Sequence, residues 1–143
     1  MTKRDLVGID VSAETLVVRV ERAGRSLGPR EFGNDPRGYG GLCRWLTRGG
    51  RRARVALEAS GIYHLDLALA LHRAGIELMV VNPRSMRAFA QALAERSKTD
   101  PLDADVCLEF VRRMPFEPWV PPTPEVLALR ALARRIGALT KTR

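Results

Sequence analysis

The sequence predicts an α/β domain in which helices flank a mixed five-stranded sheet. Three β-type segments joined by short links follow one another near the N-terminus, which indicates an antiparallel meander. Two further strand segments alternate with stretches whose apolar residues recur at helical spacing. The 143 residues, 45% of them hydrophobic, suit one domain with a sizeable core.

The meander is predicted from apolar and β-branched segments. Residues 6–11 form a short apolar run, and residues 15–20 follow after a hairpin-sized link. A weaker strand is expected over residues 26–32. Asp35 before Pro36 then predicts a helix start, because a capping side chain precedes proline at the first helical position.

The second half of the predicted sheet alternates strands with helices. Residues 54–58 read as the fourth strand, and Ser60 is expected to cap a helix over residues 62–73. Residues 76–81 are almost wholly apolar, which is typical of a strand buried on both faces. Pro83 is expected to open the next helix.

The remaining chain is predicted to continue in helices. After a polar break over residues 95–99, Asp100 followed by Pro101 predicts another helix start. We expect residues 1–114 to form the folded domain, residues 115–124 a proline-rich linker, and residues 125–143 the beginning of a coiled-coil helix.

The charge balance points to a polyanionic partner. The net charge is +8, and arginine supplies 21 of the 24 basic residues. Arginine binds phosphate groups bidentately, which favours nucleic acid, although arginine written in place of lysine throughout would give the same composition. The cations singled out as candidate nucleic-acid contacts are Arg51, Arg52, Arg54, Arg96 and Lys98.

Several protein classes are excluded or disfavoured. No apolar run approaches the roughly 18 residues that a membrane span needs, so no membrane partner is expected. Cys43 and Cys107 lie far apart and only two histidines are present, which disfavours a zinc site or a disulfide framework. A reducing cytoplasm is the expected compartment.

Acidic residues fall at the ends of predicted strands. Three meander strands followed by two α/β units is the order of the ribonuclease H-like fold, in which the first and fourth strands are neighbours. Asp10 and Glu58 end those two strands, so their carboxylates are expected to converge. Asp100 and Asp103 share one face of a helix start.

Four such carboxylates suit hard cations. Oxygen ligands without a histidine or cysteine cluster favour Mg²⁺ or Mn²⁺, and two ions can clamp a phosphodiester during displacement. Structural alternatives stay open for each acid. Asp100 and Asp103 can cap a helix, Asp10 can cap a turn, and Glu58 can pair with an arginine.

Four separate segments also resemble a known family. VGIDVS, LEASGIY, VNP and KTDPLDA are similar to the N-terminal RuvC-like DEDD domain of the IS-one-ten family of insertion-sequence transposases, relatives of the Piv/MooV DNA invertases. These segments span residues 7–12, 57–63, 81–83 and 98–104. The resemblance extends over about residues 5 to 120.

The resemblance implies a site and partners. Asp10, Glu58, Asp100 and Asp103 would be the catalytic acids that hold Mg²⁺ (or Mn²⁺) beside a scissile DNA phosphate. The family implies recombination guided by a structured bridge RNA, a serine nucleophile on a second domain, and a homo-oligomer (dimer or tetramer). Since the sequence ends inside what resembles the coiled coil, the active site of this chain alone is expected to be incomplete.

Three other functions remain compatible with the sequence. A stand-alone RuvC-like nuclease or junction resolvase would use the same metals with water as nucleophile. An actin-like sugar kinase also has Gly-Ile-Asp in its first strand, but needs a second phosphate-binding segment. A non-catalytic RNA-binding or oligomerisation module would use the acids as caps.

Overall fold

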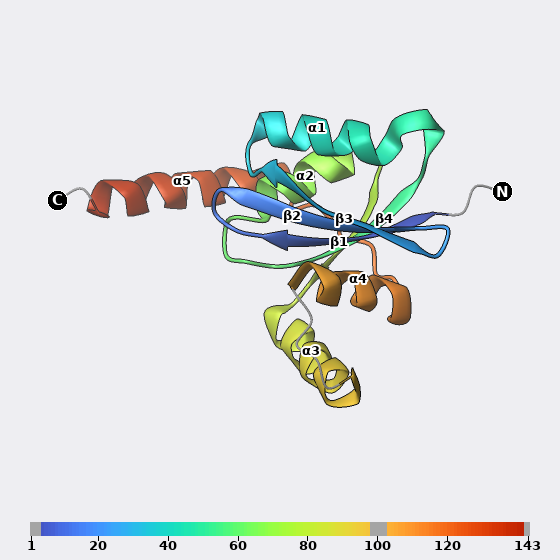
Figure 1. The fold of residues 1–143 in the computed structure, drawn as a ribbon. Coiled ribbons are helices and arrows are strands. Elements are labelled where there is room, and N and C mark those ends of the chain that lie inside the picture. Colours follow the sequence, from blue (N-terminus) through green and yellow to red (C-terminus); the bar gives the residue numbers. More distant parts are fainter. Residues whose placement is uncertain (1–3, 98–102, 142–143) are drawn as a thin grey trace.

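A computed structural model describes residues 4–97 and 103–141 of the chain (Figure 1). The elements, in chain order, are β1 (Asp5–Val11), β2 (Thr15–Arg22), β3 (Arg25–Gly33), α1 (Pro36–Thr47), the 3-10 turn η1 (Arg48–Gly50), β4 (Ala53–Glu58), α2 (Leu65–Arg73), β5 (Glu77–Val81), α3 (Pro83–Ser97), α4 (Asp103–Arg113) and α5 (Pro124–Lys141).

One mixed sheet organises these elements, in the strand order β3-β2-β1-β4-β5. The strand β2 pairs antiparallel with both β1 and β3, which is the expected meander. The strand β4 pairs parallel with β1 and with β5. The predicted α/β fold with a mixed five-stranded sheet is therefore confirmed.

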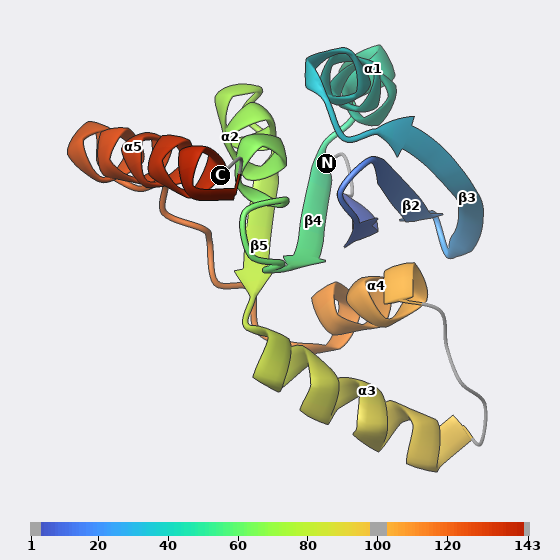
Figure 2. The ribbon, with the colours of Figure 1, turned by 90° about the vertical axis from the view of Figure 1, so that its left-hand side faces the viewer.

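Helices cover both faces of the sheet. Helices α1 and α2 lie over one face, and α3 and α4 lie on the opposite side (Figure 2). Successive residues of a strand point to opposite faces. In β1, Val7 and Ile9 are fully buried in the core that includes α1 and α2, whereas Gly8 faces α4. Ala56 of β4 belongs to the second core, on the α4 side.

The first helix begins as predicted. Asp35 has extended backbone angles, and its Oδ1 accepts a 2.7 Å hydrogen bond from the backbone N–H of Gly38. Pro36 occupies the first turn, where its missing N–H has no partner to lose. Tyr39, Leu42 and Leu46 follow at helical spacing and are buried.

The predicted start of the second helix is wrong. Helix α2 begins at Leu65, and the hydroxyl of Ser60 caps no helix. Gly61 has a φ of 57°, a left-handed conformation that stops helical winding directly after Ser60. The chain makes a turn instead, in which the Ser60 N–H donates to His64 Nδ1 at 3.1 Å.

The third helix is longer than predicted. The polar break expected over residues 95–99 does not interrupt α3 before Ser97. The predicted helix start at Asp100 lies outside the described residues, as does Lys98. The described part of α4 begins at Asp103, with Asp103 and Asp105 in its first turn.

The chain after α4 runs along the outer edge of the sheet. The backbone N–H of Trp119 donates to the carbonyl of Leu78 in β5 at 2.9 Å. Helix α5 then exposes Leu129, Leu132 and Ile136, of which 65%, 53% and 56% are accessible. Coiled-coil pairing of this helix stays a prediction. Among the described residues, no helix has the length and hydropathy required to cross a membrane.

Candidate metal centre

Two of the predicted acids end neighbouring strands. In the parallel register of β1 and β4, Gly8 lies opposite Ala56 and Ile9 opposite Leu57. Asp10 and Glu58 occupy the next positions of the two strands. Because side chains alternate along a strand, both carboxylates fall on the face of Gly8 and Ala56, which α4 covers.

Helix α4 brings a third acid to this end of the sheet. A Cβ atom on Gly8 would lie 2.3 Å from the backbone nitrogen of Leu108 and 2.4 Å from the carbonyl oxygen of Ala104. The helix backbone therefore rests directly on β1. Asp103, the first described residue of α4, precedes this contact, and its charge acts on Asp10 at the end of β1.

Burial and neighbouring negative charge raise the pKa values of the two strand-end carboxylates. Burial raises the pKa of Asp10 above its ordinary value, and the negative charge of Asp103 raises it further. Burial is also the largest cause of the raised pKa of Glu58, followed by the charges of Asp103 and Asp10. A bound cation would offset both the lost hydration and the mutual repulsion.

Sequence reasoning missed two side chains beside these acids. The thiol of Cys107, one turn after Asp103, has its pKa raised to about 12 by burial first and then by the charges of Glu58, Asp10 and Asp103. The guanidinium of Arg87 on α3 acts in the opposite direction and lowers the pKa of Glu58. Both electrostatic effects depend on where α3 and α4 cross the sheet, which no local sequence pattern encodes.

The structure also sets limits on this cluster. Within the described residues, no three His, Cys, Asp or Glu side chains lie close enough together to hold a metal ion by themselves. Asp100, the fourth predicted ligand, lies outside those residues. The carboxylate of Asp105, two residues after Asp103, pairs instead with Arg19 of β2 at 2.9 Å.

The predicted nucleic-acid contacts are dispersed. Arg51 and Arg52 directly precede β4, and Arg54 is its second residue, so Arg54 lies about 13 Å along the strand from Glu58 at about 3.3 Å per residue. Arg54 pairs with Glu77 at 2.8 Å and stacks 4.2 Å from the Phe116 ring centroid.

The remaining contacts and exposure of these cations differ from one to the next. Arg51 lies 3.9 Å from Asp5. Arg96 is exposed in the last turn of α3, and Lys98 lies outside the described residues. Arg54 is therefore engaged by contacts within the chain, whereas Arg96 is exposed at the end of α3.

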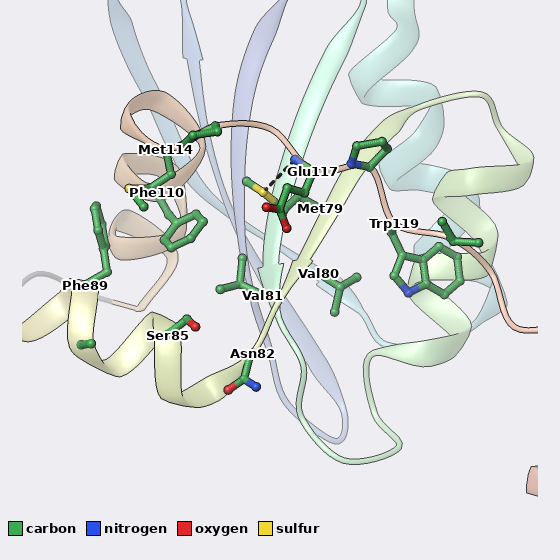
Figure 3. A pocket seen from close by; sticks show the side chains of 14 residues that line it. Met79, Val80, Val81, Asn82, Ser85, Phe89, Phe110, Met114, Glu117 and Trp119 are labelled. Carbon is green, nitrogen blue, oxygen red and sulfur yellow. Dashed lines mark hydrogen bonds between the residues drawn. The ribbon is translucent and has the colours of Figure 1, made fainter.

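A cavity of about 810 Å³ lies at the outer edge of β5, between α3, the end of α4 and residues 114–120 (Figure 3). Figure 3 shows Phe89 and Phe110 on one side and Trp119 on the other. None of Asp10, Glu58 and Asp103 lines this cavity. The candidate metal centre is therefore at the strand ends and not in this cavity.

A sheet of this order, with acids ending β1 and β4, defines a RuvC-like domain of the ribonuclease H-like class. T. thermophilus RuvC in complex with Holliday junction substrate has this fold, with a TM-score of 0.54 and 14% identity over 82% of this chain and 100% of that chain. A second Thermus thermophilus RuvC structure gives a TM-score of 0.55 and 19% identity over 80% and 99%.

Family membership is more specific than the fold. The family model of IS110-type DEDD transposases, described as a transposase, matches residues 7–143. The chain therefore belongs to the IS110 family of DEDD transposases. No curated protein sequence matches it.

Proposed function

We propose that the chain is the metal-dependent catalytic domain of a transposase that cleaves and exchanges DNA strands. The observation that carries this proposal is the placement of Asp10 and Glu58 at the ends of two neighbouring parallel strands, where burial and the charge of Asp103 raise the pKa of both carboxylates. Burial and like-charge repulsion disfavour the ionised form of a carboxylate unless a cation is bound. Groups perturbed in this way cluster at functional sites.

The donor set fits Mg²⁺ or Mn²⁺. Asp10, Glu58 and Asp103, together with Asp100, would hold the metal through carboxylate oxygens, the ligands that these hard ions prefer. When bound, the metal supplies Lewis-acid polarisation of a phosphodiester and stabilises charge on its oxygens. The chain's own strands and helix orient the carboxylates and bury Asp10 and Glu58 in part.

The surroundings of the carboxylates support these roles. Gly8 and Ala56 are buried below them, and the neutral Cys107 thiol is 2% exposed. Arg87 reaches the same region from α3 and is the cation whose charge lowers the pKa of Glu58. Its exposed guanidinium is suited to contact a phosphate oxygen of the bound strand.

DNA is the proposed substrate. The likeness to a RuvC solved with a Holliday junction supports this, as does the net charge of +8. A groove of about 690 Å³ also begins at the turn after Glu58 and is bordered by Arg130 and Arg134 of α5. Neither arginine has an ion pair among the ion pairs found in the described residues, so both are available to DNA phosphates.

The finer parts of the proposal rest on the family. We include guidance by a bridge RNA, assembly into a dimer or tetramer through a coiled coil that begins in α5, and a serine supplied by a second domain. The exposed Leu129, Leu132 and Ile136 of α5 support self-association. A cytoplasmic location accords with this function.

Two substitutions test the proposal. In the transposase, Asp10→Asn and Glu58→Gln each preserve side-chain size but remove a charged ligand, so Mg²⁺-dependent cleavage of donor DNA should fall by about 100-fold or more. Asp105→Asn is the matched control, because Asp105 pairs with Arg19 away from the site. Cleavage by Asp10→Asn at the wild-type rate, in a folded protein, would contradict the proposal.

A second candidate function is a junction-resolving nuclease, which the fold likeness to RuvC favours. The same cleavage assay separates the two functions. Cutting of a four-way junction without any RNA supports the nuclease, whereas RNA-dependent exchange between donor and target DNA supports the transposase.

A further inference from the structure

Asn34 joins the two loops that follow the acid-bearing strands. It lies between β3 and α1, and its side-chain Nδ2 donates to two backbone carbonyls, those of Ser12 at 2.7 Å and Tyr63 at 3.0 Å. Ser12 follows Asp10 by two residues, and Tyr63 follows Glu58 by five. One amide group thus bridges the loops that follow β1 and β4.

The orientation of this amide is fixed from the core. The hydroxyl of Tyr39 donates to Asn34 Oδ1, which leaves both N–H groups of the amide for the two carbonyls. Tyr39 is 8% exposed and belongs to the hydrophobic core under α1. The backbone N–H of Asn34 adds a fourth contact, to the carbonyl of Glu14 at 2.9 Å.

Each bridged loop is itself closed by hydrogen bonds. The Ser12 N–H donates to the Thr15 carbonyl at 3.0 Å, and the Tyr63 N–H donates to the Ser60 carbonyl at 3.0 Å. Holding one carbonyl in each loop therefore restrains the whole loop. Asp10 and Glu58 lie just before these loops, so restraining the loops also limits the movement of the two residues.

We propose that Asn34 is a positioning residue that holds the ends of β1 and β4 at the spacing at which Asp10 and Glu58 share a cation. This role rests on the proposed metal-dependent function and adds a residue that carries no charge and touches no metal. Without the bridge, repulsion between the two carboxylates would act on two loops that no longer share a side-chain anchor.

The test is a titration of the 143-residue chain with Mn²⁺, in which calorimetry measures the binding affinity. Asn34→Asp is isosteric and keeps the acceptor for Tyr39, but it replaces the two donors with an oxygen that faces two carbonyls. We expect the Mn²⁺ affinity to fall about tenfold, the lower end of the range for outer partners of metal sites. Added negative charge alone would strengthen cation binding, so a loss cannot come from charge.

Two further variants separate positioning from stability. Asp35→Ala removes the neighbouring cap of α1, so it should lower the Tm and leave Mn²⁺ affinity unchanged. Tyr39→Phe frees the amide to rotate and should weaken Mn²⁺ binding with little change in size, which decides the matter if Asn34→Asp fails to fold. In a DNA cleavage assay, Asn34→Asp and Tyr39→Phe should each need a higher Mg²⁺ concentration for half-maximal activity. Their cleavage rate at saturating Mg²⁺ should return to that of the wild type.

The outcomes are distinguishable. Wild-type Mn²⁺ affinity in folded Asn34→Asp, or in Tyr39→Phe if the first variant is unfolded, overturns the positioning role alone. Absence of Mn²⁺ binding in the wild-type chain overturns the proposed metal centre and, with it, the role of Asn34. Equal weakening by Asp35→Ala would assign the effect to general stability and also overturn the positioning role.

Discussion

Gly8 determines how closely helix α4 approaches strand β1. The atoms that a Cβ at this position would meet are backbone atoms of α4, at 2.3 and 2.4 Å, and a backbone cannot move aside as a flexible side chain can. Closer packing of α4 brings Asp103 near the strand ends. A single missing side chain thereby supports the geometry of the candidate site.

Gly8→Ala should therefore destabilise the fold. Overpacking of a buried contact costs about 1–3 kcal/mol, and the backbone neighbours place this position at the upper end. Gly40→Ala is the control, because the added Cβ in α1 meets only a flexible Arg44 side chain at 3.4 Å and gains about 0.5–1 kcal/mol of helix stability. Urea unfolding measures both, and equal stability of Gly8→Ala and wild type would refute the close contact.

Single residues differ in how much of their role the sequence reveals. Asp10 and Glu58 could be recognised because an acid among apolar strand residues is costly unless it has a partner. Their nearness followed from the strand order and agrees with the register of β1 and β4. Arg87, Cys107 and Asn34 could not be recognised, since each acts on residues far away in the chain through the packing of other elements.

At the scale of elements, the turn between β4 and α2 departs most from the predicted structure. The prediction placed a capping serine and a helix where Gly61 adopts a positive φ and His64 accepts a hydrogen bond from Ser60. The strands and α1 were easier, because periodicity and a cap followed by proline are local patterns. The turn depends on the ring of His64, which is four residues from Ser60 and is buried although Ile62 and Tyr63 are exposed.

His64 gives this turn a pH dependence. Burial and the charge of Arg130 lower the pKa of His64, and only the neutral ring can accept from the Ser60 N–H. The folded state then binds fewer protons than the unfolded state between the lowered pKa and the ordinary value of 6.5, so stability rises with pH in this window. The stabilising contribution of His64 is fully present above pH 6.5 and is lost as the pH falls through the lowered pKa.

His64→Asn removes the titrating group and should flatten that part of the stability profile. Urea unfolding of wild type and variant at a series of pH values between 5 and 7.5 measures it, since the ordinary pKa of histidine, about 6.5, falls inside this range. An unchanged slope in the variant would show that other groups cause the pH dependence.

At the scale of the whole molecule, the arginines fall into two groups. One group is neutralised within the fold, as with Arg112 and Arg113, which pair with Glu109 and, for Arg112, also Glu21. The other group includes Arg130 and Arg134, which border the groove next to the turn after Glu58. Composition counts every arginine alike and does not show which ones are paired within the fold. The proposed DNA path could therefore be inferred only from the structure.

These two groups should respond differently to salt. Replacing Arg130 and Arg134 with glutamine removes two proposed phosphate contacts, so the slope of log affinity for duplex DNA against log salt should become shallower by about 1.8. Replacing Arg112 and Arg113 with glutamine changes the net charge equally and should leave the slope nearly unchanged. Fluorescence anisotropy at several salt concentrations measures both, and equal slopes in the two double variants would contradict the proposed path.

The most direct test of the metal centre is a crystal structure of the chain grown with Mn²⁺, with anomalous diffraction used to locate the ion. We expect an anomalous peak about 2 Å from carboxylate oxygens of both Asp10 and Glu58, a normal distance for such ions. The peak should be absent from Asp10→Asn crystals grown in the same way. A wild-type structure with Mn²⁺ bound only elsewhere, or with Asp10 and Glu58 bare, would contradict the account.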